Sequence, residues 1–112
     1  MKKLFLASLL LSAVVLFSAC DKLKGNAVTF YVVNAGSAGK WDHISVQIGS
    51  KSGSFFTPER RNMVVTDCEG AENSITFDLP SGTYSYTAKG SATWEGTITV
   101  DNGDCKLVGL RY

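Results

Sequence analysis

The sequence has few of the residues on which most enzymes and nucleic-acid-binding proteins depend. It contains one histidine, two prolines and three cysteines among 112 residues, and eleven Lys and Arg are balanced by ten Asp and Glu. The net charge of +1 leaves no basic excess to neutralise phosphates, so we expect no nucleic acid as a partner. A chain of this length holds one modest domain, which excludes a multidomain enzyme.

The motifs of common catalytic and metal sites are also missing. There is no G-x-S-x-G, no glycine-rich phosphate loop, no H-E-x-x-H and no pair of Cys-x-x-Cys clusters. His43 has no nucleophile motif beside it and is expected at the surface. Asp67, Glu69 and Glu72 fit a solvated turn, and D-N-G-D at 101–104 fits a hairpin turn better than a calcium loop. We therefore expect no enzyme, no metal and no cofactor.

One long hydrophobic run is present, and it lies at the beginning of the chain. Two lysines precede fourteen uncharged residues, Leu4 to Phe17, and the small residues Ser18 and Ala19 follow. A bilayer core of roughly 30 Å takes about 20 apolar residues as a helix, so this run is short for a permanent anchor. The order of basic start, apolar run and small residues is typical of an export signal, and it predicts a cleaved helical signal peptide over residues 1–19.

The run F-S-A-C at 17–20 resembles the lipobox of bacterial lipoproteins. In that family the cysteine is acylated and becomes the first residue of the mature chain, which implies lipidation at Cys20 and palmitate among its acyl chains. The segment after Cys20 is short and charged and contains Gly25, which predicts a lipidated N-terminus and short tether over residues 20–26. The resemblance implies a membrane partner reached through the lipid. It also implies the bacterial cell envelope, on the inner or outer membrane, with the domain in the periplasm or at the cell surface. An ordinary cleaved signal, with Cys20 as an incidental thiol, and an uncleaved anchor are the alternatives.

From Ala27 onward the sequence has no long run with helical apolar spacing and alternates between apolar and polar residues instead. Segments rich in β-branched and aromatic residues are separated by turn-forming residues. Strands are expected at Val28 to Val33, Ile44 to Gly49, Ser54 to Thr57, Met63 to Cys68, Ser74 to Leu79, Thr83 to Lys89, Ala92 to Val100 and Cys105 to Arg111. They predict an all-β domain over residues 27–112, either a small barrel or a two-sheet antiparallel sandwich of about seven or eight strands, of which we favour the sandwich.

Two cysteines remain once Cys20 is committed to lipid. Cys68 and Cys105 would lie in a compartment where disulfides persist, and they are 37 positions apart. Closing that loop would remove roughly 4 kcal/mol of unfolded-chain entropy. Free thiols and metal ligation are the alternatives, although zinc would need further ligands nearby. We expect a disulfide between them.

The run L-P-S-G-T-Y-S-Y-T-A at 79–88, followed by W-E-G-T-I-T-V, resembles the late hairpin of transthyretin-like domains related to the carboxypeptidase regulatory domain. The resemblance covers about the last 35 residues. It implies a sandwich in which Tyr84 packs inward, and accessory, non-catalytic roles. No ligand-binding residue carries over from it.

Aromatic residues near polar groups are the candidates for ligand contact. Trp41 lies in a glycine-rich connection, where it would contact a ligand or plug the end of the sandwich. Phe55 and Phe56 form a second cluster with Arg60 and Arg61; one phenylalanine must point outward in a strand, and arginine pairs well with carboxylates. We therefore predict a non-enzymatic binding or structural module whose partner is an envelope protein or a glycan.

A different reading comes from S-G-T-Y at 81–84 and Y-T-A-K-G at 86–90, which resemble the two motifs of bacterial inhibitors of C-type lysozyme. In that family the motifs present polar residues to the active-site carboxylates of the enzyme, which here implicates Ser81 and Lys89. Inhibition of a secreted hydrolase such as lysozyme is therefore the alternative function.

Overall fold

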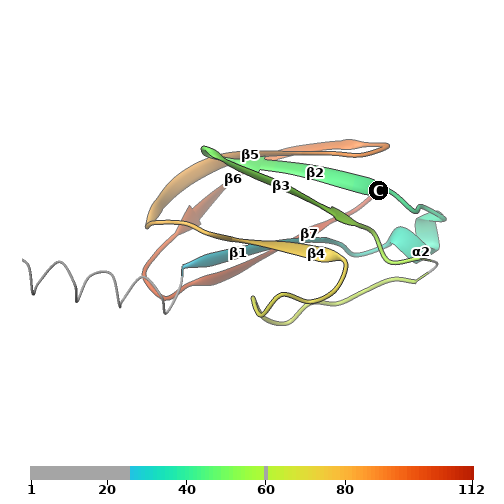
Figure 1. Cartoon of the computed structure of the whole chain (residues 1–112), viewed down its shortest axis with the longest axis horizontal. Coiled ribbons are helices and arrows are strands. Elements are labelled where there is room, and N and C mark those ends of the chain that lie inside the picture. Colours follow the sequence, from blue (N-terminus) through green and yellow to red (C-terminus); the bar gives the residue numbers. More distant parts are fainter. Residues whose placement is uncertain (1–25, 60) are drawn as a thin grey trace, which may run out of the picture.

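Two packed β-sheets form the body of the protein in the computed structural model, which describes residues 26–59 and 61–112 (Figure 1). The strands are β1 (Ala27–Val32), β2 (His43–Ile48), β3 (Lys51–Phe56), β4 (Ser74–Asp78), β5 (Gly82–Lys89), β6 (Thr93–Val100) and β7 (Cys105–Leu110). One sheet has the strand order β4-β1-β7 and the other β3-β2-β5-β6. The predicted all-β, two-sheet sandwich is confirmed. The predicted signal peptide, Cys20 and all but the last residue of the tether lie outside the described residues.

The first and last strands lie side by side in the same direction. β1 pairs with β7 in parallel, from Ala27 opposite Cys105 to Val32 opposite Leu110, whereas the other pairings are antiparallel. This parallel pair departs from the expected purely antiparallel arrangement. The D-N-G-D turn is not a hairpin either, because β6 and β7 belong to different sheets. The turn carries the chain from one sheet to the other, and Asp104 Oδ2 accepts a 2.9 Å hydrogen bond from the Asp101 N–H.

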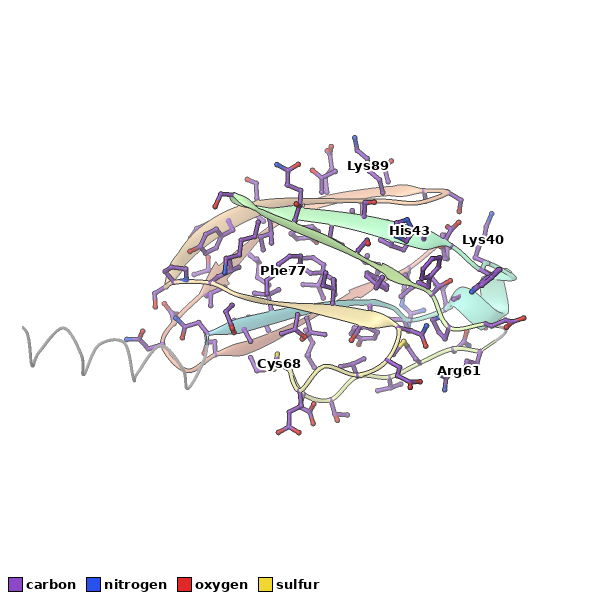
Figure 2. All side chains as sticks on the ribbon, in the orientation of Figure 1. Lys40, His43, Arg61, Cys68, Phe77 and Lys89 are labelled. Atoms are coloured by element: carbon purple, nitrogen blue, oxygen red, sulfur yellow. A yellow bond between two sulfur atoms is a disulfide. The ribbon has the colours of Figure 1, made fainter. Side chains whose placement is uncertain are left out.

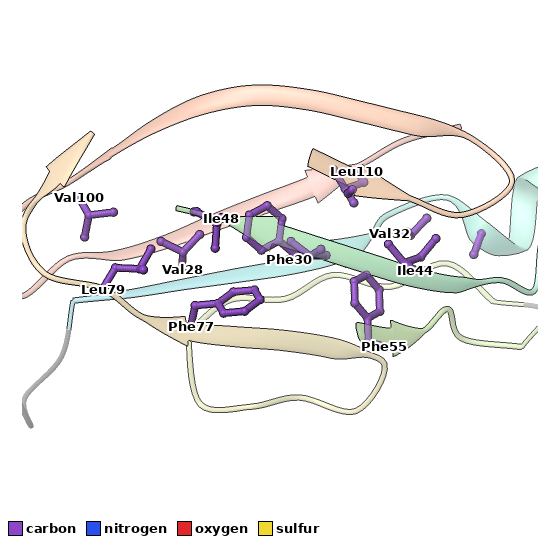
Figure 3. Close-up of a cluster of buried hydrophobic side chains, with 13 residues drawn as sticks. Val28, Phe30, Val32, Ile44, Ile48, Phe55, Phe77, Leu79, Val100 and Leu110 are labelled. Carbon is purple, nitrogen blue, oxygen red and sulfur yellow. The ribbon is translucent and has the colours of Figure 1, made fainter. Parts of the chain in front are cut away.

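The core lies between the two sheets and follows the alternation of the strands (Figure 3). Phe30 is fully buried at its centre and makes edge-to-face contacts with Phe77 and Tyr86, with ring centroids 5.9 and 5.1 Å apart. Each large apolar side chain buried in this way stabilises the fold by about 1.5–3 kcal/mol. The cluster is made of Val28, Phe30, Val32, Ala35, Ile44, Val46, Ile48, Phe55, Phe77, Leu79, Ala88, Val100 and Leu110.

The predicted strand at 63–68 is wrong. Residues 61–73, here called the strap, have no strand and lie against the outer face of the three-stranded sheet (Figure 1). The strap pairs with neither edge strand of that sheet, β4 or β7, and the disulfide of Cys68 to Cys105 holds it against the sheet instead. Within the strap, Val65 is buried, and the Met63 N–H donates a 3.1 Å hydrogen bond to the Val33 carbonyl.

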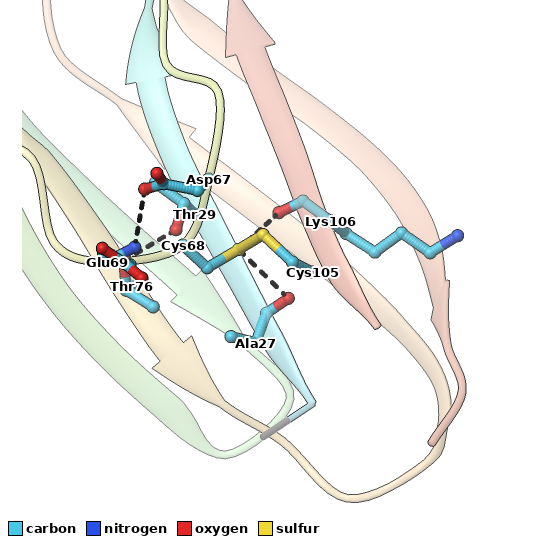
Figure 4. Close-up of a disulfide and its surroundings, with 8 residues drawn as sticks. All are labelled: Ala27, Thr29, Asp67, Cys68, Glu69, Thr76, Cys105 and Lys106. Atoms are coloured by element: carbon cyan, nitrogen blue, oxygen red, sulfur yellow. Dashed lines mark hydrogen bonds between the residues drawn. A yellow bond between two sulfur atoms is a disulfide. The ribbon is translucent and has the colours of Figure 1, made fainter. Parts of the chain in front are cut away.

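A disulfide fastens the strap to the sheet, as predicted. Cys68 is bonded to Cys105, the first residue of β7 (Figure 4). The Cys68 Sγ also lies 3.7 Å from the Ala27 carbonyl oxygen and 3.8 Å from that of Lys106. A disulfide sulfur carries no proton, so these are packing contacts. They show that the strap closes over the start of β1.

The connection between β1 and β2 contains one short helix that the sequence did not predict, α2 (Ala35–Ala38). The Gly36 N–H donates a 3.1 Å hydrogen bond to the Arg61 carbonyl of the strap. A Cβ at Gly36 would lie 2.6 Å from the Arg61 carbonyl carbon, so a glycine is required for this close approach. The helix and the strap thus hold each other at the far end of β1.

Candidate functional site

The outer faces of the two sheets differ. The strap covers the central strand of the three-stranded sheet, where Thr29 on the outward side is fully buried, with its hydroxyl 2.7 Å from that of Thr76. The outer side of the β3-β2-β5-β6 sheet, here called the open face, has no such cover within the described residues. Its outward positions are His43, Ser45, Gln47, Ser52, Ser54, Phe56, Thr83, Ser85, Thr87, Lys89, Thr93, Glu95, Thr97 and Thr99.

An exposed group of aromatic rings lies at one end of the open face. His43 and Phe56 are cross-strand neighbours on β2 and β3, with ring centroids 4.8 Å apart. Trp41, in the connection before β2, has its ring centroid 6.3 Å from that of Phe56. The exposed fractions of Trp41 and Phe56 are 68% and 54%. We call these three residues the aromatic platform.

Asp42 fixes the chain segment that carries Trp41. Its Oδ2 accepts hydrogen bonds of 2.9 and 2.6 Å from the Ser91 N–H and hydroxyl, and one of 2.5 Å from the Tyr112 hydroxyl. Its backbone N–H donates to Thr57 Oγ1 and its carbonyl accepts from the Thr57 N–H. The hydrogen bonds from Ser91 and Tyr112 to the carboxylate hold the pKa of Asp42 below its ordinary value. Trp41 is therefore presented on a segment tied to three other parts of the chain.

The C-terminal residue packs beside this segment. Burial, and then the hydrogen bond to Asp42, raise the pKa of Tyr112 to about 12. Its ring lies 5.2 Å from Trp94, whose indole N–H donates a 2.7 Å hydrogen bond to the Arg111 carbonyl. The Lys40 Nζ lies 5.9 Å from the Tyr112 ring centroid. These contacts connect the segment of Lys40 and Asp42 to Tyr112 and, through its ring, to Trp94 on β6.

A polar groove continues from the aromatic platform along the open face. Its volume is about 420 Å³. The lining residues are Ser45, Val46, Gln47, Ser52, Gly53, Ser54, Thr87 and Lys89. The register of β2 and β3 pairs His43 with Phe56, then Ser45 with Ser54, then Gln47 with Ser52, so platform and groove follow each other without a break.

The structure separates the other candidate residues chosen from the sequence. Phe55 is only 5% exposed and belongs to the core, so it is not available for surface contact with a ligand. Arg61 is exposed on the strap and its guanidinium donates a 3.4 Å hydrogen bond to Asn73 Oδ1. Arg60 lies outside the described residues. Trp41 and Phe56, which the sequence assigned to separate clusters, are brought together in one platform.

The two residues implicated in hydrolase inhibition lie at opposite ends of β5. Lys89 is at the end of β5 that borders the groove, and Ser81 lies just before the beginning of that strand. An eight-residue strand spans roughly 25 Å, so one enzyme active site would not reach both. Ser81 instead donates a 3.0 Å hydrogen bond to Asn102 and accepts one of 3.3 Å from Asn26.

The aromatic platform and the start of β1 occupy opposite ends of the sandwich. At the start, the Asn26 side chain accepts a 2.7 Å hydrogen bond from the Gly103 N–H, and the Ala27 N–H donates to the Asp104 carbonyl. β1 then runs roughly 20 Å toward α2 and the end that carries His43 and Lys40 (Figure 2). A ligand at the platform would therefore bind far from the point where the described chain begins.

No protein-family model, no curated protein and no solved structure matches this chain. In the described ranges, no helix is both long and apolar enough to cross a membrane. The same ranges contain no group of three or more His, Cys, Asp or Glu side chains placed to hold a metal ion.

Proposed function

We propose that this chain is a lipid-anchored bacterial envelope protein whose domain is a non-enzymatic binding module. The observation that carries the proposal is the exposed aromatic platform on a segment fixed by Asp42. Large aromatic side chains contribute much of the energy of binding surfaces, and rings that are already held in place lose little conformational freedom on binding. The open face is thus suited to a ligand.

The anchor is proposed from F-S-A-C at 17–20. Acyl chains contribute about 0.8 kcal/mol per buried methylene, so several chains on Cys20 would hold the protein firmly in a leaflet. The position of Asn26 supports this arrangement, because a tether over residues 20–26 would attach at the end of the sandwich remote from Trp41. The platform would then face away from the membrane.

A relation to transthyretin-like domains is proposed for the fold. Tyr84 packs against the core, as that resemblance implies, and its hydroxyl donates a 2.6 Å hydrogen bond to the Pro80 carbonyl. A tyrosine that bonds back to the chain just upstream braces the corner where a strand begins in several β-sandwiches.

The binding role is tested by photo-crosslinking in living cells. The photoreactive amino acid p-benzoylphenylalanine is introduced at Phe56, and at Val64 as the control, since Val64 is 81% exposed on the strap over the opposite sheet. We expect a discrete adduct with an envelope component from position 56 and none from position 64. No adduct, or the same adducts from both positions, would contradict the binding role.

The anchor is tested separately by intact-mass spectrometry of the protein extracted from membranes. We expect a polypeptide that begins at Cys20 and carries a diacylglyceryl group and a further acyl chain. A polypeptide that retains Met1, or one with an unmodified thiol at position 20, would contradict the proposal.

A further inference from the structure

We infer that the open face binds a neutral polysaccharide, which lies along the polar groove and stacks on the aromatic platform. This inference rests on the proposed binding function and names its ligand class. It follows from the chemistry of the groove, from the absence of a dominant charge, and from the continuity of groove and platform.

The groove offers neutral hydrogen-bonding groups in a row. Four hydroxyls, from Ser45, Ser52, Ser54 and Thr87, and the amide of Gln47 line it. Hydroxyls and amides both donate and accept hydrogen bonds, as sugar hydroxyls do. A ligand covered with hydroxyl groups can therefore satisfy the groove without leaving either partner with an unpaired polar group.

The platform offers the complementary apolar contact. A sugar ring carries its hydroxyls around the edge and exposes C–H groups on its faces, and such a face packs against an aromatic ring. Trp41 and Phe56 are exposed and lie 6.3 Å apart between centroids, tilted by 31°. One ring can thus stack at the platform while the following rings use the hydroxyls of the groove.

Charge argues against an ionic ligand. Apart from His43, the charged outward positions on the four described strands of the open face are Lys89 and Glu95, which have opposite signs. A groove with one ammonium group provides little attraction for a polyanion. A folded protein is also a poor match, because protein interfaces have an apolar centre within a polar rim, and here the rings lie at one end of a row of hydroxyls.

The dimensions fit a polymer better than a single sugar. From Gln47 through Ser45 to His43 the outward side chains span roughly 14 Å, enough for a short run of sugar rings. The volume of about 420 Å³ is spread along this row on a sheet surface. One ring would bury little area there, whereas linked rings add their contacts within one molecule.

The test is affinity electrophoresis of the full-length, membrane-extracted protein in a polyoxyethylene detergent, which carries no sugar headgroup. Native gels contain dextran, mannan, laminarin or hydroxyethylcellulose. Carboxymethylcellulose serves as the charged counterpart of hydroxyethylcellulose. We expect one or more of the four neutral polymers to retard the protein, and the charged counterpart to retard it less.

Variants then place the binding site. Trp41→Ala and Gln47→Ala should each weaken the retardation at least about tenfold, as loss of a contact that carries much of the binding energy does. Val64→Ala, which trims an exposed apolar side chain on the other side of the sandwich, should leave it unchanged. Far-ultraviolet circular dichroism of each variant checks that the fold is kept, and Gln47→Glu, which keeps the side-chain shape, provides a second test at that position.

The outcomes separate this inference from the function on which it rests. Retardation by neutral polymers that Trp41→Ala and Gln47→Ala abolish supports both. If none of the four neutral polymers retards the protein, or if Val64→Ala weakens retardation as much as Trp41→Ala, the polysaccharide inference is wrong. In that case a protein adduct from position 56 in the crosslinking experiment would keep the binding module, and the absence of any adduct would remove it too.

Discussion

The Tyr112 hydroxyl donates a 2.5 Å hydrogen bond to Asp42, and so joins the last residue of the chain to the residue beside Trp41. The two residues are 70 positions apart in the sequence. Ser91, in the turn between β5 and β6, donates to the same carboxylate oxygen. The platform therefore depends on one carboxylate that collects hydrogen bonds from two distant parts of the chain.

Low pH should weaken the hydrogen bonds that Ser91 and Tyr112 donate to the Asp42 carboxylate. Because the folded protein lowers the pKa of Asp42 from 3.8, the ionised carboxylate stabilises the fold above that pH, and the contribution is lost as the pH falls through the lower folded value. Asp42→Asn should thus be less stable than the parent at pH 6, and the difference should shrink below about pH 3.8. Urea unfolding of parent and variant at pH 6 and at a pH below 3.8 measures this difference in stability, with Glu95→Gln as the control. A difference that stays constant down to pH 2 would count against this role of Asp42.

Alkaline titration should show that the Tyr112 hydroxyl ionises at a higher pH than an ordinary tyrosine. Its pKa is raised from 10.0 to about 12, so the protonated hydroxyl stabilises the fold below pH 10, and this contribution is lost between pH 10 and 12. Phenolate absorbance of the folded protein should include a step near pH 12 that Tyr112→Phe removes. If the variant instead loses a step near pH 10, the bond between Tyr112 and Asp42 is not formed in solution.

The two adjacent phenylalanines of β3 should behave in opposite ways. Phe55 is buried in the core, so Phe55→Ala should lower the free energy of unfolding by about 3–5 kcal/mol. Phe56 is exposed, so Phe56→Ala should change it by less than about 0.5 kcal/mol. Denaturant unfolding followed by circular dichroism compares them. The reverse order would mean that β3 presents its other face to the core, and equal costs would contradict the difference in burial between the two residues.

Alternation along the strands was enough to predict the sandwich and most of its core. Ile44, Val46 and Ile48 face inward as their spacing indicates, and all three are buried. Alternation alone does not say which segment finds an open sheet edge, and for that reason residues 63–68 were wrongly predicted as a strand. The parallel pairing of β1 with β7 depends on the same long-range choice.

The candidate site was only partly predictable for a related reason. Trp41 and Phe56 were chosen for their residue type, but their contact depends on the register between β2 and β3. The third predicted strand begins at Ser54, whereas β3 begins at Lys51, so the cross-strand partner of His43 could not be derived. The groove was missed altogether, because serine and threonine on a strand look the same whether the face they line is open or covered.

Loss of the disulfide should destabilise the domain. The pair Cys68→Ala and Cys105→Ala opens a loop of 37 positions, which should lower the free energy of unfolding by about 4 kcal/mol. The strap would lose its attachment to β7, whereas the platform, at the other end of β1, should keep its contacts. Urea unfolding measures the loss, and Val64→Ala is the control on the same strap. A loss below about 1 kcal/mol would show that the strap is held mainly by other contacts.

The two tryptophans provide the most direct test of the open face as a binding surface. Trp41 is 68% exposed on the platform, whereas the Trp94 indole N–H is bonded to the Arg111 carbonyl. Two-dimensional ¹H–¹⁵N spectra resolve both indole N–H signals, and Trp41→Phe assigns them. When oligosaccharides of the four neutral polymer backbones are added, the Trp41 signal should shift and the Trp94 signal should stay in place. If neither signal moves with any of the four, or only that of Trp94 moves, the platform does not bind these glycans.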